Sequence, residues 1–107
     1  MIYKFKSKSA GDVIMMGANG DQLLRLLGHD PAPKGILESA TLPAAIQALE
    51  QAVAADEKAR ADAEAEAASK GEKLPPAEGV SLRQRVWPMV EMMKRSAKNG
   101  HDIVWGV

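Results

Sequence analysis

One stretch of the chain limits the possible folds more than any other, because residues 54–70 contain no large apolar side chain. The stretch alternates alanine with acidic and basic residues, a composition with very high helix propensity. Such a helix has almost no apolar surface to bury against a core. We therefore expect it to run off the core into solvent and fray, and we treat residues 54–79 as a polar helical extension and connector outside the core of a single domain, residues 1–107.

The two ends of the chain have the composition of β-strands. Residues 2–6 alternate apolar and polar side chains, so Tyr3 and Phe5 share one face, which we expect to be the core face. Residues 103–107 are mostly β-branched and aromatic, and so apolar a chain end is best explained by docking into a sheet. We expect the two terminal strands to pair, with a short third strand near residues 35–38.

The first long helix is marked by its start. Thr41 is a candidate N-cap, and Pro43 fits the first turn, where its missing N–H costs little. Apolar side chains then recur at helical spacing, at Ile46, Leu49 and Val53. This spacing predicts a helix whose first part packs on the core.

The last helix has both a start and a stop. Ser81 and Gln84 have the spacing of a capping box, and residues 99–100 (Asn-Gly) end the helix. Its core face is formed by Leu82, Val86, Met89, Val90, Met93 and Ala97. Pro88 lies inside the helix and is expected to kink it or to mark a restart after Trp87.

The segment between the first strand and the first long helix holds shorter elements. Ser9 begins a capping-box spacing, so we favour a short helix over residues 13–16, with a strand as the alternative because a four-residue apolar run fits both. Residues 18–21 predict a turn, followed by a short helix over residues 23–27 that Gly28 ends.

Together these elements predict an α+β fold. A small sheet of two to three strands pairs the N- and C-terminal strands, and helices cover one of its faces. The Ala/Glu-rich helix protrudes from the core, and it forms an antiparallel hairpin with the last helix.

Composition excludes several classes of protein. The chain has no cysteine, so disulfides, thiolate metal sites and cysteine nucleophiles are ruled out. The formal net charge is zero, which argues against a strong field for nucleic acid or membrane. We see no secretory leader and no apolar run of the ~20 residues that a membrane span needs, so we expect a cytoplasmic protein without a membrane partner.

Several stretches, at both ends of the chain and in between, resemble one family. They are residues 3–8 (YKFKSK), 11–13 (GDV), 20–25 (GDQLLR), 80–85 (VSLRQR), 87–88 (WP) and 104–107 (VWGV). The chain is similar there to short bacterial proteins, mostly from beta-proteobacteria, catalogued as domain-of-unknown-function family eighteen-forty. The resemblance implies a small, stand-alone cytoplasmic protein and brings no activity, cofactor or catalytic residue to carry over.

The tripeptide Gly-His-Asp occurs twice, at residues 28–30 and 100–102, each time after an expected helix end. His and Asp are metal ligands, so the two copies could form a four-ligand zinc or iron site if the loops met. The candidate ligands are His29, Asp30, His101 and Asp102. The competing interpretation, which we favour, is that each glycine ends its helix and each histidine lies near the helix's negative end.

The last helix is rich in basic residues, which suggests a patch for nucleic acid or an acidic partner. They are Arg83, Arg85, Lys94, Arg95 and Lys98. The alternative is an ordinary solvated helix face, and the zero net charge favours it.

No catalytic residue and no cofactor-binding motif is predicted, because no serine or threonine has a nucleophile-elbow pattern and no acid/base pair accompanies one. The leading hypothesis is a non-enzymatic protein-interaction or regulatory module, with a protein partner or a second copy bound through an exposed sheet edge or the helical hairpin. The alternatives are a small-ligand or metal-binding protein that uses the His-Asp loops and a weak nucleic-acid binder.

Overall fold

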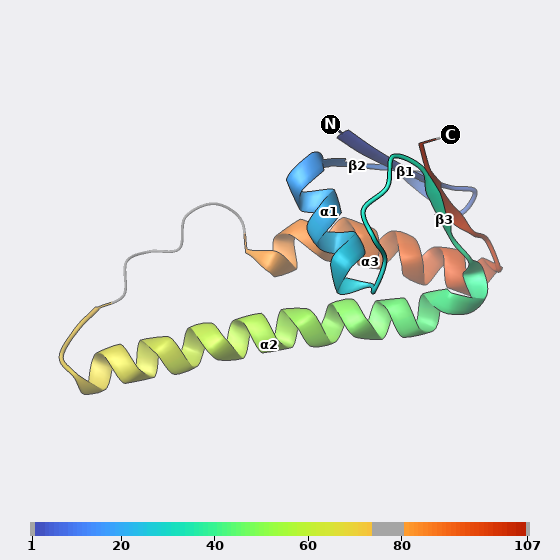
Figure 1. Ribbon diagram of the computed structural model, residues 1–107. Coiled ribbons are helices and arrows are strands. Elements are labelled where there is room, and N and C mark those ends of the chain that lie inside the picture. Colours follow the sequence, from blue (N-terminus) through green and yellow to red (C-terminus); the bar gives the residue numbers. More distant parts are fainter. Residues whose placement is uncertain (1, 74–80, 107) are drawn as a thin grey trace.

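The computed structural model describes residues 2–73 and 81–106 (Figure 1). Its elements are β1 (Ile2–Ser7), β2 (Ala10–Met16), α1 (Gly17–Leu26), β3 (Gly35–Leu37), the 3₁₀ turn η1 (Ser39–Thr41), α2 (Leu42–Ser69), α3 (Leu82–Asn99) and β4 (Ile103–Trp105). The strands form one antiparallel sheet in the order β2-β1-β4-β3. In Figure 1 the helices lie on one side of this sheet. The predicted α+β class and the protruding helix are confirmed.

The terminal strands pair in the middle of the sheet, as expected. Phe5 lies opposite Trp105 in the β1–β4 ladder. Tyr3 and Phe5 are buried with stacked rings 5.8 Å apart, and the Trp105 ring lies 5.6 Å from that of Phe5. The Tyr3 hydroxyl donates a hydrogen bond to the carboxylate of Asp21 in α1. The alternating pattern of the first strand therefore predicts the core face correctly.

The preferred helix over residues 13–16 is wrong, because these residues belong to β2. The Ser9 hydroxyl, expected as a helix cap, instead contacts His101 Nδ1 and accepts a hydrogen bond from Asn99. β1 offers a long antiparallel partner in which Tyr3 lies opposite Met15. Pairing with β1 gives the segment a ladder of backbone hydrogen bonds along one edge, which a single turn of helix cannot match.

The turn expected at residues 18–21 is also wrong, because α1 already begins at Gly17. Gly20 is buried against Tyr3, and a Cβ added there would lie 2.1 Å from the ring. The Asn-Gly pair therefore serves close packing instead of turn geometry. The predicted end at Gly28 is confirmed, since this glycine has φ +79° and His29 N donates back to the Leu24 carbonyl at 2.8 Å.

The long helix α2 divides into a packed half and an exposed half. Leu42, Leu49 and Val53 are buried, whereas residues 54–69 are exposed apart from Ala67. Ion pairs four residues apart line the exposed half, such as Lys58–Asp62 at 2.9 Å. Because of this arm, the radius of gyration is 15.9 Å, against about 13 Å for a compact chain of this length. Thr41 is at the N-cap position of α2, as predicted, but its side chain makes no capping hydrogen bond, because its hydroxyl donates to the Glu38 carbonyl.

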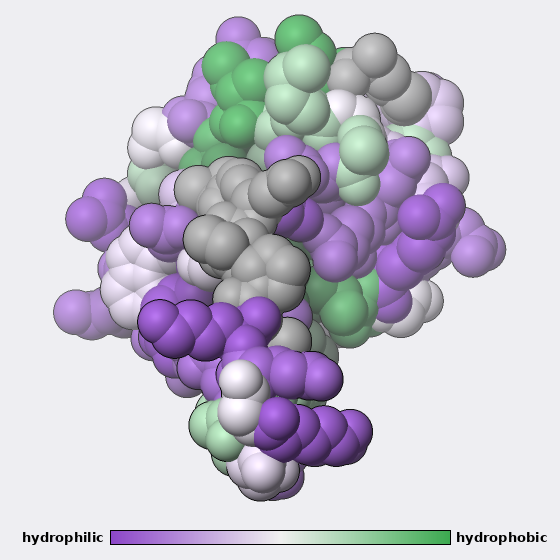
Figure 2. Space-filling view, turned by 90° about the vertical axis from the view of Figure 1, so that its left-hand side faces the viewer, coloured by the Kyte–Doolittle hydropathy of each residue, from purple (hydrophilic) through white to green (hydrophobic). Residues whose placement is uncertain are grey.

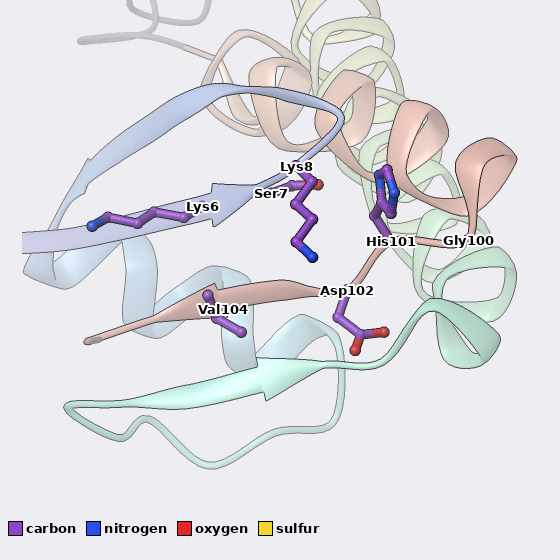
Figure 3. A pocket seen from close by; sticks show the side chains of 7 residues that line it. All are labelled: Lys6, Ser7, Lys8, Gly100, His101, Asp102 and Val104. Atoms are coloured by element: carbon purple, nitrogen blue, oxygen red, sulfur yellow. The ribbon is translucent and has the colours of Figure 1, made fainter.

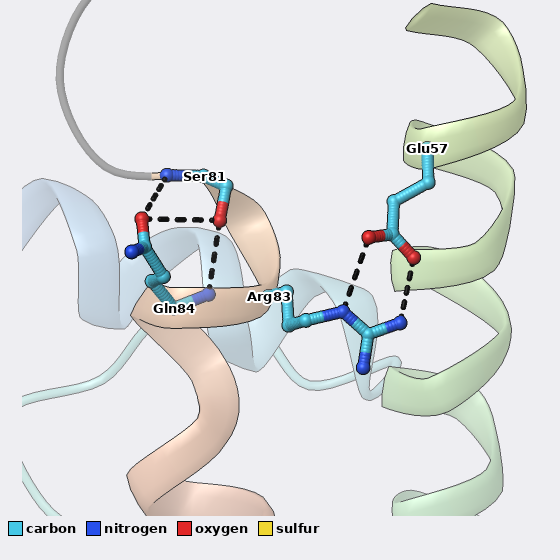
Figure 4. A network of polar contacts seen from close by, with 4 residues as sticks. All are labelled: Glu57, Ser81, Arg83 and Gln84. Atoms are coloured by element: carbon cyan, nitrogen blue, oxygen red, sulfur yellow. Dashed lines mark hydrogen bonds and ion pairs between the residues drawn. The ribbon is translucent and has the colours of Figure 1, made fainter. Parts of the chain in front are cut away.

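The last helix, α3, begins with the predicted capping box between Ser81 and Gln84 (Figure 4). It continues through Pro88, so the predicted restart there is wrong. Gly100, with φ +69°, ends it as expected. The predicted connector at residues 71–79 lies mostly outside the described residues, and so does the last residue of the strand predicted at 103–107.

The α2–α3 hairpin is antiparallel, as predicted. Arg83 at the start of α3 pairs with Glu57 of α2 at 2.6 Å (Figure 4), and Lys94 further along α3 lies 3.9 Å from Glu50. The core between this hairpin and the sheet is filled largely by methionine and leucine side chains. Within the described ranges, no helix is both long and apolar enough to cross a membrane.

Candidate functional site

The outer face of the sheet, turned away from the helices, exposes large apolar side chains. Ile2, Ile14 and Met16 are 62%, 63% and 63% exposed, and Ile36 on β3 is 44% exposed. Ile2 lies opposite Met16 in the β1–β2 ladder. Figure 2 shows hydrophobic surface gathered at the top of the molecule, over the sheet. An exposed cluster of this kind is typical of an interaction surface.

The outer face also carries basic side chains. Lys4 and Lys6 alternate with the buried aromatic residues of β1, so they lie on the same face as Ile2. Lys4 lies opposite Ile14 and 3.6 Å from Asp12, and Lys6 lies opposite Val104. The face therefore combines apolar side chains with ammonium groups.

A hollow of about 500 Å³ lies at one end of the outer face (Figure 3). Its lining residues are Lys6, Ser7, Lys8, Gly100, His101, Asp102 and Val104. They come from the end of β1, the turn after it, and the connection from α3 into β4. Lys6 and Val104 belong to both the hollow and the outer face, so the two features are continuous.

His101 is held in place at the rim of this hollow. Its Nδ1 lies 2.5 Å from the Ser9 hydroxyl, and Asn99 Nδ2 donates to the same hydroxyl oxygen at 3.2 Å. The His101 backbone N–H donates to the Ser96 carbonyl at 2.9 Å, which satisfies the end of α3. The backbone of His101 therefore fits the competing interpretation, in which this histidine lies near the end of a helix.

Asp102 lines the hollow and also contacts the segment after β3, which is the strand at one edge of the sheet. Its Oδ1 accepts a hydrogen bond from the Ser39 backbone N–H at 2.7 Å. Ser39 begins η1, directly after β3. One oxygen of the Asp102 carboxylate therefore already has a hydrogen-bond donor before any ligand binds.

The two His-Asp pairs do not come together. The His29 ring lies 6.4 Å from that of Trp105, at the last residue of β4, whereas His101 precedes the first residue of that strand. Among the residues that the structure describes, no group of three or more His, Asp or Glu side chains is arranged to hold a metal ion. A site with His29, Asp30, His101 and Asp102 as common ligands stays a prediction without structural support.

The basic residues of α3 are largely engaged with neighbouring elements. Arg83 contacts Glu57 with two nitrogens, at 2.6 and 3.1 Å, and these hydrogen bonds lower the pKa of Glu57 below its usual value. Arg85 donates to Gln22 of α1 at 2.9 Å. Lys94 lies near Glu50 and 5.8 Å from the centre of the Trp87 ring.

Arg95 and Lys98 are exposed on the same helix. Acids of α2 lie beside two of the five residues and offset their charge. A nucleic-acid patch on α3 stays a prediction.

Sequence reasoning missed both the outer face and the hollow. The alternation that places Tyr3 and Phe5 inside also places Ile2, Lys4 and Lys6 outside, so part of the face could have been predicted. The other part depends on β2, which was expected to be a helix. The hollow joins residues more than ninety positions apart, and no local pattern predicts that.

Comparison with known proteins gives one result. No curated protein and no solved structure matches the chain. The family model described as "Domain of unknown function (DUF1840)" matches residues 1–105, nearly the whole chain. The chain therefore belongs to the DUF1840 family, as its resemblance predicted.

Proposed function

We propose that this protein is a non-enzymatic interaction module that binds a partner protein on the outer face of its sheet. The observation that carries the proposal is the exposure of Ile2, Ile14 and Met16, each above 60%, on the face opposite the helices. Burying such side chains on binding is favourable by roughly 25 cal/mol per Å² of apolar surface before the costs of association.

The charge of the outer face indicates the chemistry of the partner. Lys4 and Lys6 lie along β1 and Lys8 just after it, and Asp12 lies beside Lys4. A partner segment that alternates apolar and acidic residues would match both properties, because alternate side chains of an extended segment point to one side.

A second copy of the chain fits this face less well. Two outer faces stacked on one another would bring the lysines of β1 close to those of the other copy, and like charges in an interface cost free energy. Self-association through the β2 edge or through the helical hairpin stays a prediction, and the experiment below tests it.

The proposal is tested with a defined peptide. The probe is an acetylated and amidated octapeptide that alternates valine and glutamate, and the control peptide has lysine in place of glutamate. We expect the glutamate peptide to shift the backbone NMR resonances of β1, β2 and β4 in a saturable way, and the lysine peptide to shift none. Lys6→Glu should weaken binding about fivefold, since one exposed ion pair is worth up to about 1 kcal/mol.

Matched controls make the result specific. Ile14→Thr keeps a β-branched residue in the strand and removes apolar surface, so it should also weaken binding. Lys58→Glu makes the same charge reversal as Lys6→Glu on the exposed arm, and it should leave binding unchanged. Equal binding of both peptides would overturn the proposal. A free protein that sediments as a dimer, with its outer face protected in that dimer, would overturn it as well.

A further inference from the structure

We infer that the hollow at the end of the outer face binds a carboxylate group, held by the ammonium group of Lys8 beside the imidazole of His101. The lining brings these two groups together from segments that are distant in sequence, while the Lys6 side chain extends along β1 away from both. In Figure 3 the Lys8 side chain extends into the space between β1 and β4, beside His101. This arrangement presents hydrogen-bond donors from two sides of the hollow.

One ring nitrogen of His101 is engaged by Ser9. Asn99 donates to the Ser9 oxygen, and the same hydroxyl contacts His101 Nδ1, to which it can donate its proton or from which it can accept one. A neutral imidazole that accepts at Nδ1 carries its proton on Nε2, and a protonated ring carries one there as well. In both of these forms the ring has an Nε2–H donor that is not used by Ser9.

The net charge of the lining favours a carboxylate over a more highly charged anion. Lys6 and Lys8 contribute two positive charges, and the carboxylate of Asp102 offsets one of them. The end of α3, which carries partial negative charge, also lies at the rim through Gly100. One negative charge balances this lining, whereas a phosphate dianion would face the carboxylate and the helix end together.

The same charges argue against a cation in the hollow. A metal ion on His101 and Asp102 would lie near the ammonium group of Lys8, which repels it. The volume of about 500 Å³ is much larger than one carboxylate and leaves room for the group that carries it. The ligand is therefore an organic acid or an acidic residue of a peptide.

These two sources of the carboxylate can be separated. Because the hollow continues into the outer face through Lys6 and Val104, the acid could belong to a partner segment bound there, and this part of the inference depends on the proposed function. A free small acid would bind without any docking on the sheet.

The experiment is an NMR titration of the intact protein with N-acetylglycine, a single carboxylate. The neutral N-acetylglycinamide serves as the matched control. We expect the acid, and not the amide, to shift the resonances of residues 6–8 and 100–104. Lys8→Gln should weaken this binding by up to about fivefold, while Lys58→Gln on the arm should not change it. Lys8 is exposed, so its replacement should leave the fold intact.

Other outcomes overturn the inference. Inorganic phosphate that binds more tightly than the acid would show that the site is not selective for carboxylates. Zinc that shifts His101 and Asp102 would show a metal site in its place. No saturable shift of residues 100–104 at high concentrations of the acid would show that the hollow is an ordinary surface depression.

The valine–glutamate peptide then distinguishes this inference from the proposed function. If the peptide binds the outer face equally well in wild type and in Lys8→Gln, and N-acetylglycine does not bind, docking stands and the carboxylate site fails. If N-acetylglycine binds and the peptide binds no more tightly than N-acetylglycine, the carboxylate site stands and docking fails. Binding of both, with loss of affinity for both in Lys8→Gln, supports the two proposals together.

Discussion

The exposed half of α2 should be a separate unit of stability, which two glycine substitutions can test. Ala63 and Ala65 lie in the middle of this arm, and both are exposed. Replacing an alanine by glycine in a helix interior costs about 1 kcal/mol in intrinsic propensity, so the double variant costs about 2 kcal/mol wherever the helix is formed. That cost enters the global free energy of unfolding only if the arm and the core unfold together.

The contacts of the arm predict that they do not unfold together. Glu57 pairs with Arg83 of α3. In the part of α2 that follows Glu57, Ala67 is the one buried residue within the described part of the chain. Exposed pairs four residues apart stabilise the arm locally by about 0.2–0.5 kcal/mol each, and they do not join it to the core. We therefore expect the double variant to change the global free energy of unfolding by less than about 0.5 kcal/mol.

Two further variants calibrate the measurement. Ala52→Gly makes the same chemical change in the packed half of α2, where it should cost the full amount of about 1 kcal/mol. Leu49→Ala removes a fully buried side chain and should cost about 2–5 kcal/mol. These variants show whether the assay detects changes of the relevant size.

The assay is urea unfolding followed by two signals. Fluorescence from Trp87 and Trp105 reports on the core, and circular dichroism at 222 nm reports on all helices. For the double variant, we expect an unchanged fluorescence midpoint and a loss of ellipticity before the main transition. A fall of about 2 kcal/mol in the fluorescence-detected stability would refute the reasoning, because the arm would then be cooperative with the core.

Three smaller predictions concern the packing around α1 and the start of α3. Gly20→Ala should destabilise the protein by about 1–3 kcal/mol in urea unfolding, because the new Cβ would overlap the Tyr3 ring. The hydrogen bond to Asp21 and burial raise the pKa of Tyr3 in the folded protein, so stability should be constant below the unfolded-state value of about 10 and fall as the pH rises above it, an effect that Tyr3→Phe should remove. Ser81→Ala should lower the free energy of unfolding by about 1 kcal/mol through loss of the hydrogen bond from Gln84 N, and a melting temperature equal to that of wild type would contradict this role.

Local patterns predict the parts of this fold that depend on neighbouring residues. The capping box at Ser81, the end of α1 at Gly28 and the inward face of β1 each follow from a few adjacent positions. The polar arm follows in the same way, because its composition alone prevents deep packing.

Two elements that depend on distant partners are predicted incorrectly, although the pairing of the terminal strands and the α2–α3 hairpin are predicted correctly. Residues 13–16 fit a helix or a strand equally well, and the choice is made by β1, which offers them an antiparallel ladder. Gly20 has turn chemistry in the sequence, but the Tyr3 ring that requires a glycine there lies in another element. The candidate site is the part least predictable from the sequence, because the outer face needs β2 to be a strand and the hollow joins the two ends of the chain.

The uncovered face of the sheet follows from how the chain distributes its apolar residues. A sheet with apolar residues on both faces would need a helical layer on each side to bury them. Here the helices lie on one side, and the residues that could have extended a second layer are the alanines and charged side chains of the arm. Such a helix cannot cover Ile2, Ile14 and Met16 with large apolar groups of its own, so these side chains stay exposed in the free protein. The polar arm and the exposed face thus have a common cause, and under the proposed function a partner protein supplies the apolar layer that the described part of the chain does not provide.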